Sequence, residues 1–261
     1  MTGKYFTRTV KPLIQPHYQV TQFNRDDVIF DFIDENKNYC KFTLPQSTAA
    51  CRLMGVTALV RGHNGVRDEF GMELLFAKSS GSGNNPPGAV GVPNATADGN
   101  GYQNQLIGAT TIDTGDFKDG LDIMAVATTR SLNNEIIIES EGLDKTHTIY
   151  VAGISLTASK PDFTDDIYST GTIATSTKVI GSLDDGSGGS PSIENKFDVG
   201  DVIYQYPSGS STVGDGNLLG TIASIDSATQ FTLVDNCANG IVDNARLFNV
   251  HPITLILSFE S

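Results

Sequence analysis

The sequence predicts an all-β protein in which a jelly-roll-like β-sandwich is followed by a smaller β-barrel or meander. Three observations predict this class. Few windows place apolar residues at the helical spacing i, i+3, i+4 and i+7. Runs rich in β-branched and aromatic residues recur along the whole chain. Clusters of Gly, Asn, Asp and Pro separate these runs and supply the turns between strands.

The first set of predicted strands lies in residues 26–158 and suits a two-sheet sandwich. Each run is rich in residues that favour strands and ends at a turn signal. The eight segments are Val28–Ile33, Tyr39–Leu44, Arg52–Arg61, Gly71–Lys78, Leu106–Thr111, Asp122–Thr129, Asn134–Ser140 and Thr146–Leu156.

A second set lies in residues 165–261 and suits a small barrel. The polar stretch Ser159–Asp166 precedes it, and Pro161 within that stretch interrupts strand pairing. The final apolar run, Ile253–Phe259, either belongs to the barrel or returns to the sandwich. The predicted strands are Gly171–Ile180, Asp201–Tyr206, Leu219–Ile225, Gln230–Leu233 and Arg246–Phe259.

Residues 1–25 carry basic side chains and no acidic one, although the whole chain has 17 Lys+Arg against 30 Asp+Glu and a net charge of −13. Within this segment, Tyr5–Val10 alternates in the manner of a strand. It is either an arm that adds a strand to a partner's sheet or the first strand of the sandwich itself. We expect it to bind a partner through Lys4, Tyr5, Phe6, Arg8 and Lys11.

Composition argues against several classes of protein. The acidic balance disfavours binding to nucleic acid, whose phosphates repel negative charge. No apolar run approaches the roughly 18–20 residues of a membrane helix, and no secretory signal opens the sequence, so we expect a protein without a membrane partner that is made in a cytosol. The odd set Cys40, Cys51 and Cys237 lacks metal-site spacing and predicts buried free thiols.

The sequence contains no catalytic, cofactor-binding or metal-binding motif, so we expect a protein that is not an enzyme and has no cofactor. Its four histidines lie far apart, and the Gly-rich segment Gly81–Pro86 ends in proline where a dinucleotide fingerprint needs Gly or Ala before a helix. The acidic turns at 184–185 and 162–166 lack the alternating ligands of a calcium loop, so solvated turns are the favoured interpretation. Residues 79–105 and 181–190 are long polar loops that suit surface contacts.

Three consecutive segments, Phe197–Tyr204, Leu218–Ser227 and Thr229–Leu233, resemble a module of tailed-bacteriophage virion proteins. In physical terms, Gly200-Asp201 is a turn into a strand, Gly220 permits a bulge, and Asp226–Thr229 forms a hairpin turn. The resemblance covers about residues 171–250. The segments Leu53–Val60, Glu73–Lys78 and Asn104–Gly108 are similar to a phage virion sandwich.

The resemblance implies a non-enzymatic structural component of a virion that assembles in the bacterial cytoplasm. We expect a capsid decoration or cement protein that binds the major capsid protein or other virion subunits. A homo-oligomer, expected to be a trimer, suits the symmetry of such assemblies. The alternative is a tail, baseplate or fibre-associated protein, with loops such as 79–105 binding host-surface glycans.

Overall fold

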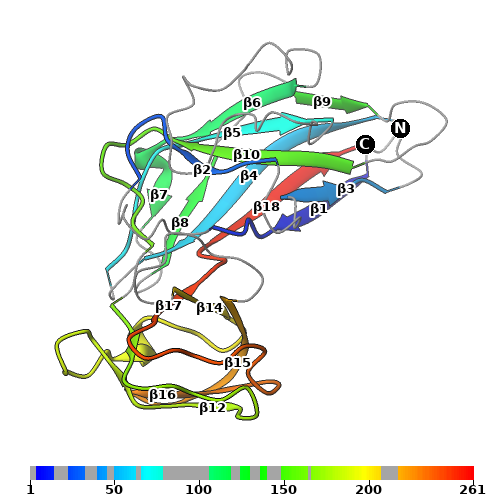
Figure 1. Cartoon of the computed structure of the whole chain (residues 1–261). Helices are drawn as coiled ribbons and strands as arrows, with labels where there is room; N and C mark the ends of the chain where they lie inside the picture. Colours follow the sequence, from blue (N-terminus) through cyan, green and yellow to red (C-terminus); the bar gives the residue numbers. More distant parts are fainter. Residues whose placement is uncertain are drawn as a thin grey trace.

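The computed structural model describes residues 4–14, 23–32, 40–45, 50–62, 66–78, 106–118, 124–129, 136–139, 148–163, 166–206 and 217–261. These residues form antiparallel strands, turns and two short 3-10 helices, η3 (Thr114–Asp116) and η4 (Ile193–Asn195). The predicted all-β class is therefore confirmed. Figure 1 shows a two-layer sandwich with a smaller barrel-like sheet at one end. The predicted loop 79–105, the turn at 63–65 and three of the four histidines lie outside the described residues.

The sandwich consists of two antiparallel sheets. In sheet 1 the spatial order is β1 (Tyr5–Val10), β18 (Ile253–Glu260), β4 (Ala50–Arg61), β8 (Met124–Thr128) and β7 (Phe117–Lys118), and β9 (Ile136–Glu139) also pairs with β4. In sheet 2 the order is β2 (Val28–Phe30), β10 (Thr148–Ser155), β5 (Met72–Ala77) and β6 (Leu106–Ile112), and β3 (Lys41–Thr43) also pairs with β10.

The sandwich core forms because buried and exposed side chains alternate along its longer strands. In β18 every second residue from Ile253 to Phe259 is buried, and β4 and β5 show the same period. The inward residues of both sheets join one hydrophobic cluster that includes Phe30, Phe76 and Leu257. Cys40 and Cys51 lie in this cluster and Cys237 lies in the core of the barrel, so the prediction of buried free thiols is confirmed.

The smaller sheet curls into a nearly closed barrel around its own core. Its order is β12 (Val179–Ile180), β16 (Gln230–Leu233), β15 (Leu218–Ser227), β14 (Val202–Tyr206), β17 (Arg246–Asn249), β11 (Tyr168–Ser169) and β13 (Leu183–Asp184). The two edge strands, β12 and β13, are separated by only Gly181 and Ser182, which brings the edges together. Gly220 adopts φ +150° next to a register shift between β14 and β15, as the predicted bulge requires.

Two predicted strands of the barrel region were wrong in extent. Gly171–Ile180 is a strand only at its last two residues, and before them Ile173 makes one isolated bridge to Ile241. The predicted strand Arg246–Phe259 is split into β17 and β18, because Pro252 has no N–H to continue a ladder. β18 then leaves the barrel and lies between β1 and β4 in sheet 1.

The barrel is an insertion between two strands of the sandwich, β10 and β18 (Figure 1). Phe163 still packs in the sandwich core, whereas Ile167 already packs in the barrel core. The chain therefore changes module between these two residues. At the other end of the sandwich, Lys4 and Ser261 exchange two backbone hydrogen bonds of 3.2 and 3.0 Å, so the two ends of the chain lie side by side.

Candidate functional site

The predicted partner-binding segment is strand β1, which pairs with β18 at the edge of sheet 1. Lys4 and Ser261 form a hydrogen-bonded pair, and the register continues without a shift to Val10 and Leu255. Such pairs alternate along an antiparallel ladder. Phe6, Arg8 and Val10 therefore bond to β18, whereas the backbone groups of the residues between them point away from it. Those residues are Tyr5, Thr7 and Thr9.

The inward side chains of β1 anchor it to the sandwich. The Phe6 ring stacks on Phe259 with ring centroids 5.2 Å apart, and Phe259 also contacts Phe42 of the opposite sheet at 5.4 Å. Val10 is buried in the same core. Of the two alternatives for Tyr5–Val10, the structure therefore shows the second, in which the segment is the first strand of the sandwich itself.

Arg8 closes the sandwich on this side. Its Nε donates to the Thr43 carbonyl of β3 at 2.7 Å, and its Nη1 donates to the Thr7 carbonyl at 3.0 Å. The guanidinium also lies 5.2 Å from the centre of the Phe6 ring, which adds a cation–π contact. Arg8 thus links the edge of sheet 1 to the edge of sheet 2, and it caps one backbone acceptor on the outer edge of β1.

The outer face of sheet 1 carries a polar row next to this edge. The Tyr5 hydroxyl donates to Glu260 Oε1 at 2.9 Å, and Arg52 Nη2 donates to Glu260 Oε2 at 2.5 Å. The hydrogen bond from Arg52, followed by that from Tyr5, lowers the pKa of Glu260. The hydrogen bond to Glu260 in turn raises the pKa of Tyr5, a residue that is 72% exposed. Tyr5 is therefore fixed in place while its ring stays accessible to a partner.

Lys11, the last predicted site residue, lies where β1 leaves the sandwich and approaches the barrel. Arg61, at the end of β4, donates to Asp198 and lies 3.2 Å from Asp201 of the barrel. Burial raises the pKa of Asp201, while Arg61 and, to a smaller extent, Lys11 lower it. These ion pairs connect Arg61 of the sandwich with the two barrel carboxylates, and Arg61 is almost fully buried at this contact.

His251 lies on the same junction, and we expect it to make stability depend on pH. Its Nδ1 lies 2.9 Å from the Pro12 carbonyl and donates to it. Burial lowers the pKa of His251, the hydrogen bond to Pro12 raises it, and Lys11 lowers it further. Because the folded state resists protonation, the unfolded state binds more protons below its pKa of about 6.5. The free energy of unfolding should therefore fall as the pH decreases from about 6.5.

This pH dependence is measured by guanidinium unfolding at pH 5, 6 and 7, with His251→Gln as the comparison. The wild type should lose more stability between pH 7 and pH 5 than the variant loses. The raised pKa of Asp201 acts in the opposite direction, and it acts above the ordinary Asp value of 3.8. Equal losses in both proteins would contradict the role of His251.

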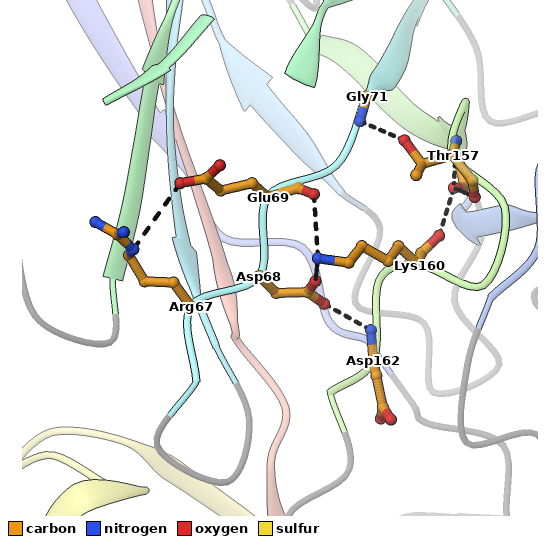
Figure 2. Close-up of polar contacts among 8 residues, drawn as sticks. Arg67, Asp68, Glu69, Gly71, Thr157, Lys160 and Asp162 are labelled. Carbon is orange, nitrogen blue, oxygen red and sulfur yellow. Dashed lines mark hydrogen bonds and ion pairs between the residues drawn. The ribbon is translucent and has the colours of Figure 1, made fainter. Parts of the chain in front are cut away.

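A second polar cluster fixes the start of the connection to the barrel (Figure 2). The carboxylate of Asp68 is buried, lies 3.0 Å from Lys160 Nζ and accepts the backbone N–H of Asp162 at 2.7 Å. Ser155 Oγ donates to the Lys160 carbonyl at 2.6 Å, and Gly71 N–H donates to Thr157 Oγ1 at 2.8 Å. Every dashed contact in Figure 2 joins residues on the sandwich side of the connection. The cluster therefore holds the first residues of the connection against the sandwich.

The carboxylates of Asp185 and Asp166, one from each predicted acidic turn, have protein partners, and Asp165 lies outside the described residues. Asp185 Oδ1 accepts the N–H groups of Ser187 and Gly189 and the Ser187 hydroxyl, which lowers the pKa of Asp185. Asp166 pairs with Arg246 at 2.9 Å. Within the described ranges, no group of three or more His, Cys, Asp and Glu residues could hold a metal ion. The helices in these ranges are all too short to cross a membrane.

The structure brings four of the five predicted site residues onto β1 and its start, and it places Lys11 one residue beyond the strand. Their partners were missed by the sequence analysis, because Thr43, Arg52 and Glu260 are separated from β1 by 35 residues or more. Only the alternative in which the final apolar run, Ile253–Phe259, returns to the sandwich indicated that Glu260 would lie in the first module.

The chain was compared with known proteins. It matches no protein-family model, no curated protein sequence and no solved structure.

Proposed function

We propose that this protein is a non-enzymatic structural component of a bacteriophage virion and that it decorates the capsid by binding neighbouring subunits. The observation that carries the proposal is the basic, open edge of β1 on a chain with a net charge of −13. Lys4, Arg8 and Lys11 lie along this edge, whereas most of the charge elsewhere is acidic. A local patch of opposite sign guides association with an acidic partner and sets its orientation.

The contacts between the barrel and the rest of the chain support a structural role. Two chain crossings join the modules, and Val250 donates a backbone hydrogen bond to Val202 while its carbonyl accepts one from Ile14. Leu13 packs against a cluster of barrel residues that includes Tyr206 and Phe248. The N-terminal segment therefore contacts the barrel immediately after it leaves sheet 1, and the two modules present one surface to a neighbour.

The phage assignment draws on the resemblance of residues 197–233 to a virion module. The described residues of this range form the turn before β14, β14 itself and the hairpin of β15 and β16, with Ser227 and Gln230 paired at the hairpin end. The local geometry is consistent with the turns that the resemblance implies. It supports the proposal without identifying the family, because the same turns occur in other small barrels.

The proposal is tested by cosedimentation of the purified chain with phage heads and, separately, with tails, each prepared from particles that lack it. We expect the full-length chain to saturate sites on heads and to leave tails unbound. Binding to tails alone would move the protein to a tail or baseplate role. Binding to neither particle would contradict a virion role.

Deletion of residues 1–25 is a poor companion to this test. It removes β1, the Phe6–Phe259 stack and the contacts of Leu13 and Ile14 with the barrel region. We expect such a truncation to unfold part of sheet 1, so a loss of binding would not identify the residues that touch the partner. Point substitutions on β1 separate folding from binding.

A further inference from the structure

We propose that the open edge of β1 accepts one extended segment of an acidic partner, which pairs with Tyr5, Thr7 and Thr9 as an additional strand of sheet 1. The inference rests on the proposed function, since it names how the neighbouring subunit is held. The sequence suggested an arm that adds a strand to a partner's sheet. In the present proposal β1 stays in its own sheet, and the partner supplies the added strand.

The backbone of β1 shows that the occupant is a strand. Phe6, Arg8 and Val10 bond to β18, which leaves the N–H and C=O groups of Tyr5, Thr7 and Thr9 directed outward at every second residue. No described strand pairs with this edge. An extended peptide is the ligand whose own backbone groups repeat at the same spacing.

The charges beside the edge show that the incoming strand is acidic. Lys4 and Arg8 are four residues apart and lie on the same side of β1, because side chains alternate along a strand. Arg8 donates to two carbonyl oxygens, and among the described residues no carboxylate pairs with it. An antiparallel or parallel partner strand would place carboxylates opposite these two cations if its own acidic residues were also four apart.

A second copy of β1 fits this edge poorly. Pairing two such strands would bring together two segments that each carry Lys4, Arg8 and Lys11 and no carboxylate between residues 4 and 11. Like charges on neighbouring strands are destabilising. This argues against a symmetric pair of β1 strands, and the occupant that we propose is an acidic segment of another protein.

Arg8 prevents unwanted pairing until this partner arrives. Its Nη1 occupies the Thr7 carbonyl, the central acceptor of the open edge, and a charged side chain in this position discourages edge-to-edge aggregation. An incoming backbone N–H would replace Nη1 at that carbonyl. The displaced Nη1 can then donate to a carboxylate of the new strand. An acidic strand therefore replaces the hydrogen bond that Arg8 loses, whereas a neutral strand does not.

The test uses Thr7→Pro and Thr7→Val in the full-length chain, with phage heads as the probe. Proline removes the outward N–H and places its ring at the edge, but breaks no hydrogen bond to β18, so the melting temperature should stay close to that of the wild type. Valine keeps the N–H and the strand geometry. We expect Thr7→Pro to weaken binding to heads by about tenfold or more and Thr7→Val to bind like the wild type.

A third variant tests the charge without altering the backbone. Lys4→Glu leaves the ladder intact, and we expect it to weaken binding to heads and to make the remaining binding less sensitive to salt. If the wild type and Thr7→Pro bind heads equally well, strand addition at β1 is wrong, but the proposed virion role is retained. If the wild type instead forms a dimer that Thr7→Pro dissolves, the acidic foreign partner is wrong. Failure of the wild type to bind any particle is a failure of the proposed function itself.

Discussion

Phe259→Ala is expected to destabilise the protein by about 3–5 kcal/mol, the usual cost of truncating a fully buried Phe. Phe259 is 1% exposed and packs between Phe6 of β1 and Phe42 of β3, so its ring joins both sheets of the sandwich. β18 is also an interior strand of sheet 1, between β1 and β4. The cavity would therefore open beneath the strand that holds the N-terminal edge in place.

The loss is measured by equilibrium unfolding in guanidinium chloride. Ser258→Ala is the matched control, because Ser258 precedes Phe259 on the same strand and faces the other side of the sheet. We expect this control to change the free energy of unfolding by about 0.5 kcal/mol or less. A similar small change in Phe259→Ala would show that β18 does not form the interior of sheet 1.

Arg61→Ala is expected to cost about 3 kcal/mol, in the range measured when one partner of a buried ion pair is removed. The Arg61 side chain is 7% exposed and that of Asp201 is 16% exposed, so Asp201 would be left near the junction without its cation. Arg61 Nε and Nη2 have no hydrogen-bond partner among the described residues. The contribution of Arg61 to stability therefore comes from the ion pairs of its Nη1. Weakening them should also uncouple the sandwich from the barrel.

Differential scanning calorimetry measures both consequences. The wild type should unfold in one transition, and Arg61→Ala should unfold at a lower temperature with a broader or divided transition. Asp198→Asn is the comparison, because the Asp198 side chain is 64% exposed and leaves no buried charge behind; we expect it to cost about 1 kcal/mol or less. An unchanged transition in Arg61→Ala would contradict the role of this ion cluster in joining the modules.

The longer strands were predictable from the sequence because each has a buried face. β16 begins and ends at the predicted residues, and β4, β5 and β15 differ from the predictions by one or two residues at their ends. The strands β7, β11 and β13 were missed, since two residues show no periodicity and form a strand only through their neighbours. The excess length predicted before β12 has a similar origin: β-branched residues favour strands, but pairing depends on the tertiary partner.

The candidate site was predictable only in part. The basic charge and the alternation of residues 5–10 identified the segment, because both are local properties of the sequence. The backbone N–H and C=O groups of Tyr5, Thr7 and Thr9 point to the open edge because of the register with β18. The sequence could not predict this register, because β18 lies almost the whole chain length away from β1. Arg8 was expected to bind a partner, and the sequence did not indicate that in the free chain its guanidinium donates to the carbonyls of Thr7 and Thr43.

The central claim is that β1 is the edge strand of its own sandwich and that its open outer edge receives a partner. Residue-resolved hydrogen exchange tests this claim most directly. In the free protein the amides of Phe6, Arg8 and Val10 should be protected, while those of Tyr5, Thr7 and Thr9 exchange quickly. After saturation with phage heads, all six should be protected. Fast exchange of all six amides in the free protein would show a detached arm, and fast exchange of Tyr5, Thr7 and Thr9 on saturated heads would contradict strand addition at this edge.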